Sequence, residues 1–303
     1  MDPLSDVLAL LKPRTSISAG LAAGGEWAVR FPMHEGIKFN AVMRGACWVS
    51  VDGDPAPHCI EEGDCFLLTK GRPFTFATDL SLAAIDPSAI YDNASRGIAT
   101  LNGGGDFFLI GGRYTFGENA DILLGVLPPV VHVRKASTHA SVLRWALDRL
   151  AAELSEGQPG GHLVCEHLAH IMLVQVLRIY LAGLNGAGAG WLHALGDRQL
   201  SRVVGAIHAD PARRWTLVEL ARIAGMSRSI FAHRFKRTAG VAPMEYVTRW
   251  RMLLAGDRLR SSSDSISSIA RSVGYQSESA FSTAFRRTMS CSPRQFQRTK
   301  AAG

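Results

Sequence analysis

Short apolar and alternating stretches follow one another from Trp27 to Phe76, and glycine-containing turns separate them. The stretches cover residues 39–42, 47–51, 59–60, 65–69 and 74–76, with turn residues at Gly45, Asp52-Gly53, Gly63-Asp64 and Gly71. Runs of this length between turn signals are typical of an antiparallel sheet or a small barrel. Further strands are expected at 80–85, 107–110 and 113–116, with a turn at 103–105.

The pattern changes period after Pro128 and Pro129. Apolar residues then recur at helical spacing, as Val142, Leu143, Ala146, Leu147 and Leu150. Residues 163–181 form a second, more apolar helical stretch, and glycines at 157–161 separate the two. Two such helices need a surface to cover their apolar sides.

A small and flexible stretch, GLNGAGAG at 183–190, follows the second helix. Its residues offer nothing to pack, which is typical of an interdomain linker. We therefore expect the domain boundary within 183–196, with helical segments from there to the C-terminus.

The C-terminal half repeats itself at an offset of 49 to 50 residues, which indicates a duplicated structural unit. The first copy spans 220–243 (LARIAGMSRSIFAHRFKRTAGVAP) and the second 269–293 (IARSVGYQSESAFSTAFRRTMSCSP). The paired residues are Ala221 with Ala270, Gly225 with Gly274, Ser227 with Ser277, Phe231 with Phe281, Phe235 with Phe285, Arg237 with Arg287 and Pro243 with Pro293.

Each copy has a short helix, a glycine turn, a serine able to cap the next helix, and a helix that is apolar on one side. This arrangement predicts a helix-turn-helix unit. With the two phenylalanines of each second helix facing the core, polar stripes face outward. The residues predicted to contact base edges in the major groove are Ser229, Ala232 and His233 in the first copy and Ser279, Ser282 and Thr283 in the second.

Positive charge is concentrated in the same half. Residues 197–303 hold 19 Lys and Arg against 7 Asp and Glu, a net charge of +12, whereas residues 1–196 carry a net charge of −5. Basic side chains beside the stripes suit phosphate contacts, which fix register without sequence information. The predicted phosphate contacts are Arg228, Arg234, Lys236, Arg237, Arg286, Arg287 and Arg298. A continuous helix at 243–259 is expected to hold the two copies at a fixed separation.

Composition limits the number of domains and the class of protein that the chain can form. A chain of 303 residues with 47% apolar residues can form two domains. The start lacks the pattern of a signal peptide, and no apolar stretch is expected to span a bilayer, so the prediction is a cytoplasmic protein without a membrane partner.

The five cysteines are spread out, without a CxxC pair, and are expected to be reduced. A redox switch formed by Cys47, Cys59 and Cys65 stays a minor hypothesis.

The C-terminal residues 199–298 resemble the AraC/XylS family of transcription regulators. The stretch IARSVGYQSESAFSTAFRR followed by CSPRQFQR carries the resemblance, and it departs from the family at Ser290, where glycine is usual. The resemblance implies double-stranded promoter DNA as a partner, a homodimer, and RNA polymerase as a partner if the protein activates.

The N-terminal half resembles, more loosely, the cupin-type sensor domain of one branch of that family. The resemblance rests on GACWVSVDG (45–53), EEGDCFLLTKGRPFTF (61–76), GGRYTF (111–116), LLGVLPPVVHV (123–133) and HLAHIMLVQVLRIYL (167–181). Phe74 stands where a metal-binding cupin has a histidine, and the histidine pair is absent around 38–40. The sequence therefore predicts no metal and no cofactor.

A small-molecule effector, if there is one, is expected to be anionic. Basic residues in or beside the predicted strands favour this, provided that several point inward. They are Arg30, Lys38, Arg44, Lys70, Arg72 and Arg113, with Lys38, Arg44, Lys70, Arg72 and Arg113 as the candidate effector contacts. His34 and His58 are left without a role, because isolated histidines are more often surface or hydrogen-bonded residues.

The predicted fold is α+β and multidomain: a cupin-like sensor barrel at 1–135, a helical dimerisation segment at 136–182, a linker at 183–196 and an all-α DNA-binding domain at 197–303. The predicted function is sequence-specific regulation of transcription, without enzymatic activity. Two alternatives stay open: a cupin-type metal enzyme fused to a nucleic-acid-binding domain, and a structural DNA binder indifferent to sequence. Metal content distinguishes the first, and equal affinity for any duplex the second.

Overall fold

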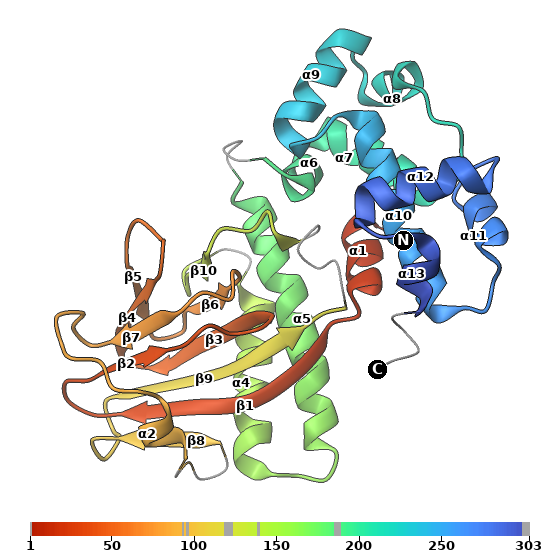
Figure 1. Cartoon of the computed structure of the whole chain (residues 1–303). Helices are drawn as coiled ribbons and strands as arrows, with labels where there is room; N and C mark the ends of the chain where they lie inside the picture. The colour runs from red at the N-terminus through yellow and green to blue at the C-terminus, as the bar shows by residue number, and fades with distance from the viewer. Residues whose placement is uncertain are drawn as a thin grey trace. The chain divides into compact units, whose positions relative to one another are not determined.

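Contacts divide the chain into two compact units in the computed structural model (Figure 1). One unit comprises Pro13–Gly183, and the other combines Met1–Lys12 with Leu184–Gly303. The structure describes residues 2–92, 94, 97–117, 124–137, 140–184 and 189–298. The sheet-rich unit and the helical unit each have a buried core of their own.

Two sheets make up most of the first unit within the described ranges. The six-stranded sheet has the order β10-β6-β3-β9-β1-β8, and the four-stranded sheet has the order β2-β7-β4-β5. Neighbouring strands are antiparallel except for β1 and β8, which are parallel. The strands are β1 Arg14–Ala23, β2 Ala28–Phe31, β3 Ile37–Arg44, β4 Ala46–Val51, β5 His58–Glu61, β6 Cys65–Leu68, β7 Phe74–Ala77, β8 Ile98–Leu101, β9 Phe107–Thr115 and β10 Val130–Val133.

One apolar cluster joins the two sheets. Val42 and Leu109 from the larger sheet and Val49, Phe74 and Phe76 from the smaller one are buried together. Inward-facing residues of two sheets packed in this way exclude water from a shared core. The sheet-rich fold predicted for this region is confirmed.

Two strand predictions need correction. No strand forms at 80–85, where Leu80 and Ile85 are exposed and Ile85 makes only an isolated bridge to Val29. The segments 107–110 and 113–116 are parts of a single strand, β9, because Gly111 and Gly112 continue its pairing with β1 and β3. Glycine at 112 is required by close packing, since a Cβ there would lie 2.3 Å from the Phe39 ring.

Within the described ranges, the helices that accompany the sheets are α2 Ser88–Tyr91, α4 Ser141–Glu156 and α5 Gly161–Ala182. Figure 1 shows α4 and α5 side by side along the larger sheet, where α5 contacts β1 and β10. The Tyr114 hydroxyl of β9 donates a buried hydrogen bond of 2.6 Å to the carbonyl oxygen of Ala169 in α5. The two helices predicted after Pro129 are thus present, and α5 is fixed to the sheet.

Helix α5 is long and apolar enough to cross a membrane by length and composition alone. The prediction that no stretch approaches this limit is therefore wrong. In the structure, 39% of its most apolar window is buried, and it packs on a sheet. Core helices of soluble domains pass the same test of length and composition.

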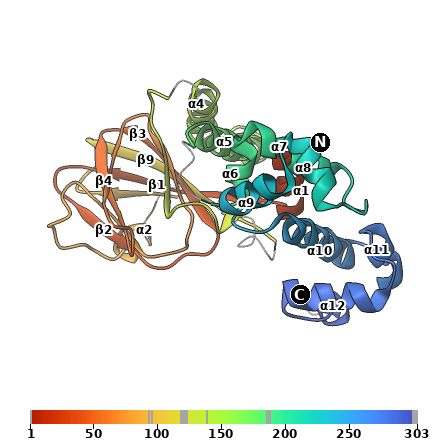
Figure 2. The same cartoon turned by 90° about the horizontal axis from the view of Figure 1, so that it is seen from above.

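The second unit contains the repeat. Its helices are α1 Pro3–Leu11, α6 Trp191–Gly196, α7 Arg198–Ala209, α8 Leu217–Ala224, α9 Arg228–Ala239, α10 Pro243–Ser261, α11 Ile266–Ser272, α12 Glu278–Met289 and α13 Pro293–Arg298. Figure 2 shows α10 running between the helices of the first copy and those of the second. Helix-turn-helix units form at α8-α9 and α11-α12, which confirms the predicted all-α domain with two such units.

The N-terminal helix belongs to this helical unit, although the sequence placed residues 1–12 with the sensor domain. Asp2 caps helix α1, because its carboxylate accepts from the Leu4 and Ser5 amides, and the helix contacts α7 and α10. Its apolar residues Leu4, Val7 and Leu11 are buried. Burial of three aliphatic side chains explains why α1 stays with the helical unit.

The segment expected to be a linker is partly structured. Trp191, Leu192 and Ala194 of α6 are buried, and α6 contacts α7 and α9. Residues 185–188 of that predicted linker lie outside the described residues. Apolar side chains at 191–194 therefore make this part of the segment an element of the helical unit.

Candidate nucleic-acid interface and effector cavity

Both helix-turn-helix units have the same kind of glycine turn and the same kind of serine helix cap. The turn glycines Gly225 and Gly274 have φ angles of 68° and 86°, which disfavour residues with a Cβ. Ser227 accepts from the Ile230 amide and Ser277 from the Ala280 amide, at 3.4 and 3.2 Å, so each serine caps its helix. The predicted serine caps are confirmed.

Buried phenylalanines fix which side of each helix faces outward. Phe231 and Phe235 in α9 and Phe281 and Phe285 in α12 are fully buried. Their ring centroids are 5.5 Å apart in α9 and 5.6 Å apart in α12. The two helices therefore anchor in the same way, and equivalent positions face solvent.

The predicted base-contact stripes lie on these outer faces. Ser229 and His233 of α9 are exposed, as are Ser279 and Thr283 of α12, while Ala232 and Ser282 are half-buried. The Thr283 hydroxyl donates its hydrogen to the Ser279 carbonyl oxygen at 3.0 Å, so its methyl group and its oxygen lone pairs are what it can offer a ligand. Each stripe is accessible within its unit.

The predicted phosphate contacts divide into two groups. Six of them are exposed, and among the residues that the structure describes none of the six has a carboxylate partner: Arg228, Lys236, Arg237, Arg286, Arg287 and Arg298. Unpaired cations on the outer side of a helix are available to an anionic partner.

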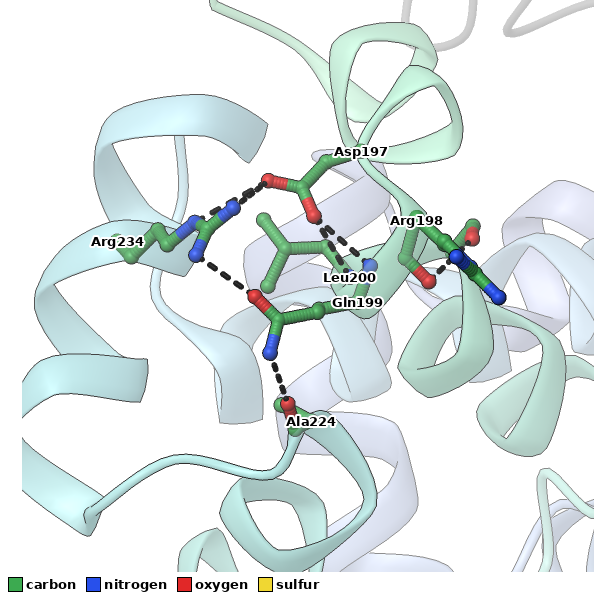
Figure 3. A network of polar contacts seen from close by, with 7 residues as sticks. Asp197, Arg198, Gln199, Leu200, Ala224 and Arg234 are labelled. Carbon is green, nitrogen blue, oxygen red and sulfur yellow. Dashed lines mark hydrogen bonds and ion pairs between the residues drawn. The ribbon is translucent and has the colours of Figure 1, made fainter.

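Arg234 is instead bonded within the unit (Figure 3). Its Nε and Nη2 donate to Asp197 Oδ2 at 3.1 and 2.6 Å, and its Nη1 donates to Gln199 Oε1 at 2.9 Å. Gln199 in turn donates to the Ala224 carbonyl oxygen at the end of α8. All three nitrogens of this guanidinium are used, which differs from the phosphate contact predicted for it.

Asp197 is the centre of this network. Its carboxylate also caps α7 by accepting from the Gln199 and Leu200 amides. Burial opposes ionisation, yet the hydrogen bonds from Leu200 and Arg234 hold the pKa of Asp197 below its usual value. One carboxylate thereby connects the start of α7 with the outer helix α9.

A second connection runs through Arg251 of α10. Its Nε donates to the Pro211 carbonyl oxygen and its Nη2 to the Arg213 carbonyl oxygen, both at 2.7 Å. The same guanidinium lies over the Tyr275 ring, 5.7 Å from its centroid. Arg251 thus joins the loop before the first helix-turn-helix unit to the turn of the second, which sequence reasoning did not identify.

Only two of the candidate effector residues line the same cavity between the sheets. This cavity of about 370 Å³ is lined by Lys38 and Arg113 together with Asn40 and several aromatic side chains. Lys38 is half-buried and Arg113 is exposed at the rim. Burial and the charge of Arg113 lower the pKa of Lys38.

The other basic candidates lie elsewhere. Lys70 donates to the Gly125 carbonyl oxygen and lines a separate cavity of about 360 Å³. Arg72 is exposed and donates to the Asp52 carbonyl oxygen, Arg30 pairs with the Asp52 carboxylate at 2.8 Å, and Arg44 is exposed at the end of β3. The five candidates therefore do not form one site.

The histidines differ from the expectation in one case. His58 contacts Asp54 at 3.1 Å, whereas both ring nitrogens of His34 are buried without a hydrogen-bond partner in the described part of the chain. Burial and the nearby Lys38 lower the pKa of His34 to about 4, so its ring is neutral near pH 7. Among the described residues no group of three or more His, Cys, Asp or Glu could hold a metal ion.

The thiols of Cys47 and Cys65 are buried, and burial raises the pKa of each to about 12. Cys59 is exposed. Because the thiolate is the reactive form, the geometry gives Cys47 and Cys65 the character of small core residues.

Comparison with known proteins gives matches over both units. Residues 2–182 match the family model described as Cupin, and residues 220–299 match the one described as Helix-turn-helix domain. A "Putative AraC-like transcription regulator" of Streptomyces antibioticus is 48% identical over 98% of this chain and 99% of its own. The "HTH-type transcriptional regulator AlkR" of Acinetobacter baylyi is 31% identical over 98% of this chain and 99% of its own.

Among solved structures, the DNA-binding domain of AdpA in complex with a target DNA is similar to part of this chain. It is 29% identical, covers 35% of this chain and 95% of its own, and has a TM-score of 0.33.

Proposed function

The chain belongs to the family of AraC-like transcription regulators, and from this premise we propose that α9 and α12 contact bases in successive major grooves of promoter DNA. The observation that carries the proposal is the pair of equivalent outer faces. His233 in α9 and Thr283 in α12 are exposed at matching positions, 50 residues apart, above equally buried phenylalanines. Two such faces on capped helices suit recognition of two neighbouring half-sites.

Phosphate contacts made by the exposed Arg and Lys side chains orient the helical unit on the DNA duplex. Arg228 and Arg237 flank the first face, and Arg286, Arg287 and Arg298 flank or follow the second. Contacts of this kind add affinity for any sequence, and the affinity falls as salt rises. Specificity then depends on the polar and small side chains of the two faces.

Selection from a random-sequence duplex library with the full chain tests the proposal. We expect enrichment of a motif with two short conserved segments about one helical turn apart. Enrichment of no motif at physiological salt, with measurable binding to every duplex, favours the structural DNA binder instead.

The N-terminal unit acts as the sensor in this proposal, and its binding of a small molecule changes how the protein engages DNA. The relatives are regulators, so we assign the barrel a binding role rather than catalysis. A protein that acts on promoters works in the cytoplasm, and RNA polymerase is the second partner if the effect is activation.

Dimerisation is assigned to α4 and α5. Apolar side chains remain exposed on both helices, with Trp145 57% and Leu163 56% accessible, and Val142 and Leu154 also exposed. A second copy of the chain is the partner that removes this surface from water. Sedimentation should show a dimer for the wild type and a monomer for Trp145→Lys, while Glu156→Lys at the end of α4 should remain dimeric.

A further inference from the structure

A cavity between the two sheets has one polar wall and one aromatic wall. The polar wall belongs to β3 and β9 of the larger sheet and contains Lys38, Asn40 and Arg113. The opposite wall is formed by Phe31 of β2, Phe74 and Phe76 of β7, and Tyr91 at the end of α2. The cavity measures about 370 Å³, within the size range of small-molecule sites.

The strand register sets the polar groups on one face. Lys38 and Arg113 are direct cross-strand partners in the β3-β9 ladder. Asn40 follows Lys38 by two residues and so shares its face, and its cross-strand partner is Gly111. Because Gly111 has no side chain, the space above it next to Asn40 stays open.

This wall carries donors that are not matched by acceptors. Like charges that face each other across a ladder repel, and no carboxylate lines the cavity among the described residues. Asn40 is only 5% exposed, and its Nδ2 has no hydrogen-bond partner within the described ranges. A buried amide donor without an acceptor is costly, so an acceptor supplied from outside would stabilise this site.

The aromatic wall limits what can carry that acceptor. Lys38 Nζ lies 5.3 Å from the Phe31 ring centroid and 5.1 Å from that of Phe74, which holds the ammonium group against the rings. Phe31 and Phe74 are stacked, with centroids 4.7 Å apart, and Phe76 is tilted against both. An apolar and flat body fits such a wall, whereas a strongly hydrated ion does not.

We propose that this cavity binds a monocarboxylate with an apolar ring, with its carboxylate at Lys38, Asn40 and Arg113 and its ring against Phe31, Phe74 and Phe76. The inference rests on the sensor role proposed for this unit and names the chemistry of its effector. It assigns no effector contact to Arg44, Lys70 or Arg72, which lie outside this cavity.

Calorimetric titration of the full chain with 2-naphthoate and with 2-naphthamide tests the proposal without any variant. The two probes share a ring and differ in charge, so the acid should bind at least tenfold more tightly than the amide. Acetate and inorganic phosphate, which have the charge without the ring, should bind at least tenfold more weakly than 2-naphthoate. Equal affinity for acid and amide, or no binding of 2-naphthoate at millimolar concentration, would overturn the proposal.

Variants locate the site. Lys38→Met, Asn40→Leu and Arg113→Met should each weaken 2-naphthoate at least tenfold, and the matched control Arg44→Gln, at the far end of the same strand, should not. Unchanged affinity in folded Lys38→Met and Arg113→Met would also overturn the assignment. DNA binding of the same preparations is measured in parallel: sequence-specific binding without acid binding removes this inference and leaves the proposed function intact.

Discussion

The guanidinium of Arg251 lies 5.7 Å from the ring centroid of Tyr275, the residue that follows the turn glycine of the second helix-turn-helix unit. Through its bonds to the Pro211 and Arg213 carbonyl oxygens, the same side chain holds the loop before the first unit. Gly274 permits this closeness, because a Cβ there would lie 2.4 Å from the Ala212 carbonyl oxygen. The spacing of the two outer helices thus depends on this contact as well as on α10.

Arg251→Ala should loosen that spacing. Loss of two charged hydrogen bonds is expected to lower the free energy of unfolding by about 1.5–3 kcal/mol. The variant should also keep more of its DNA affinity than the wild type does when a base pair is inserted between the half-sites. The control is Arg249→Ala on the same helix, which breaks only an exposed pair with Glu245. If both variants respond alike to the insertion, Arg251 does not set the spacing.

Replacement of Arg237 by alanine should weaken DNA binding, whereas replacement of Arg234 by alanine should lower stability. Arg237→Ala removes an exposed cation, so affinity should fall for all duplexes and the slope of log K against log salt should flatten by about 0.9. Arg234→Ala removes the partner of Asp197, so the free energy of unfolding should fall by about 1.5–3 kcal/mol. Salt-dependent binding assays and urea unfolding separate the two effects, and a flattened slope with unchanged stability for Arg234→Ala would argue against its internal role.

Ser290 should be replaceable by glycine with a gain in stability. It ends α12 with a φ of 60°, in the left-handed conformation that Gly240 adopts at the end of α9 with a φ of 77°. Side chains are disfavoured there, so Ser290→Gly should raise the free energy of unfolding by about 1 kcal/mol. Gly240→Ser should lower it by a similar amount in thermal or urea unfolding. A loss of stability in Ser290→Gly would mean that the serine side chain supports the turn.

Acid should destabilise the helical unit through His208. The ring of His208 stacks on Trp250 with centroids 3.6 Å apart, and its Nε2 lies 2.8 Å from the Tyr246 hydroxyl. Its Nδ1 is 3.5 Å from Asp6 Oδ2 of α1, without hydrogen-bond geometry. Burial lowers the pKa of His208 to about 3, so the folded protein keeps this ring neutral.

The unfolded chain binds one more proton at this residue once the pH falls below about 6.5, the usual pKa of histidine. The free energy of unfolding should therefore decrease from about pH 6.5 down to about pH 3, by about 2 kcal/mol between pH 7 and pH 5 from this group. His208→Phe should remove that part of the dependence in urea unfolding followed by tryptophan fluorescence. An identical pH dependence in the variant would rule out His208 as its source.

The sequence predicted the repeated unit well because its determinants are local. Ser227 and Ser277 cap helices within three residues, and Phe231 and Phe281 face inward by helical spacing alone. The role of Arg234 was not predictable in this way, since its partner Asp197 lies 37 residues away and only the fold brings them together. Arg251 escaped prediction for the same reason.

Strand prediction failed where burial and local pattern disagree. Residues 80–85 (LSLAAI) are mostly apolar, yet Leu80 and Ile85 have no sheet to cover and remain exposed. Helix α1 was missed because its apolar residues are buried by α7 and α10, some 200 residues further along the chain. The unpaired amide of Asn40 could not be predicted from the sequence either, because only the folded surroundings determine whether its Nδ2 has a hydrogen-bond partner.

Base preference in single variants tests the central claim most directly. Selection from a random duplex library is carried out with the wild type, His233→Ala and Thr283→Ala. We expect His233→Ala to relax preference at one segment of the motif and Thr283→Ala at another about one helical turn away, each by about 1–3 kcal/mol of discrimination. Motifs identical to that of the wild type in both variants would contradict base recognition by α9 and α12.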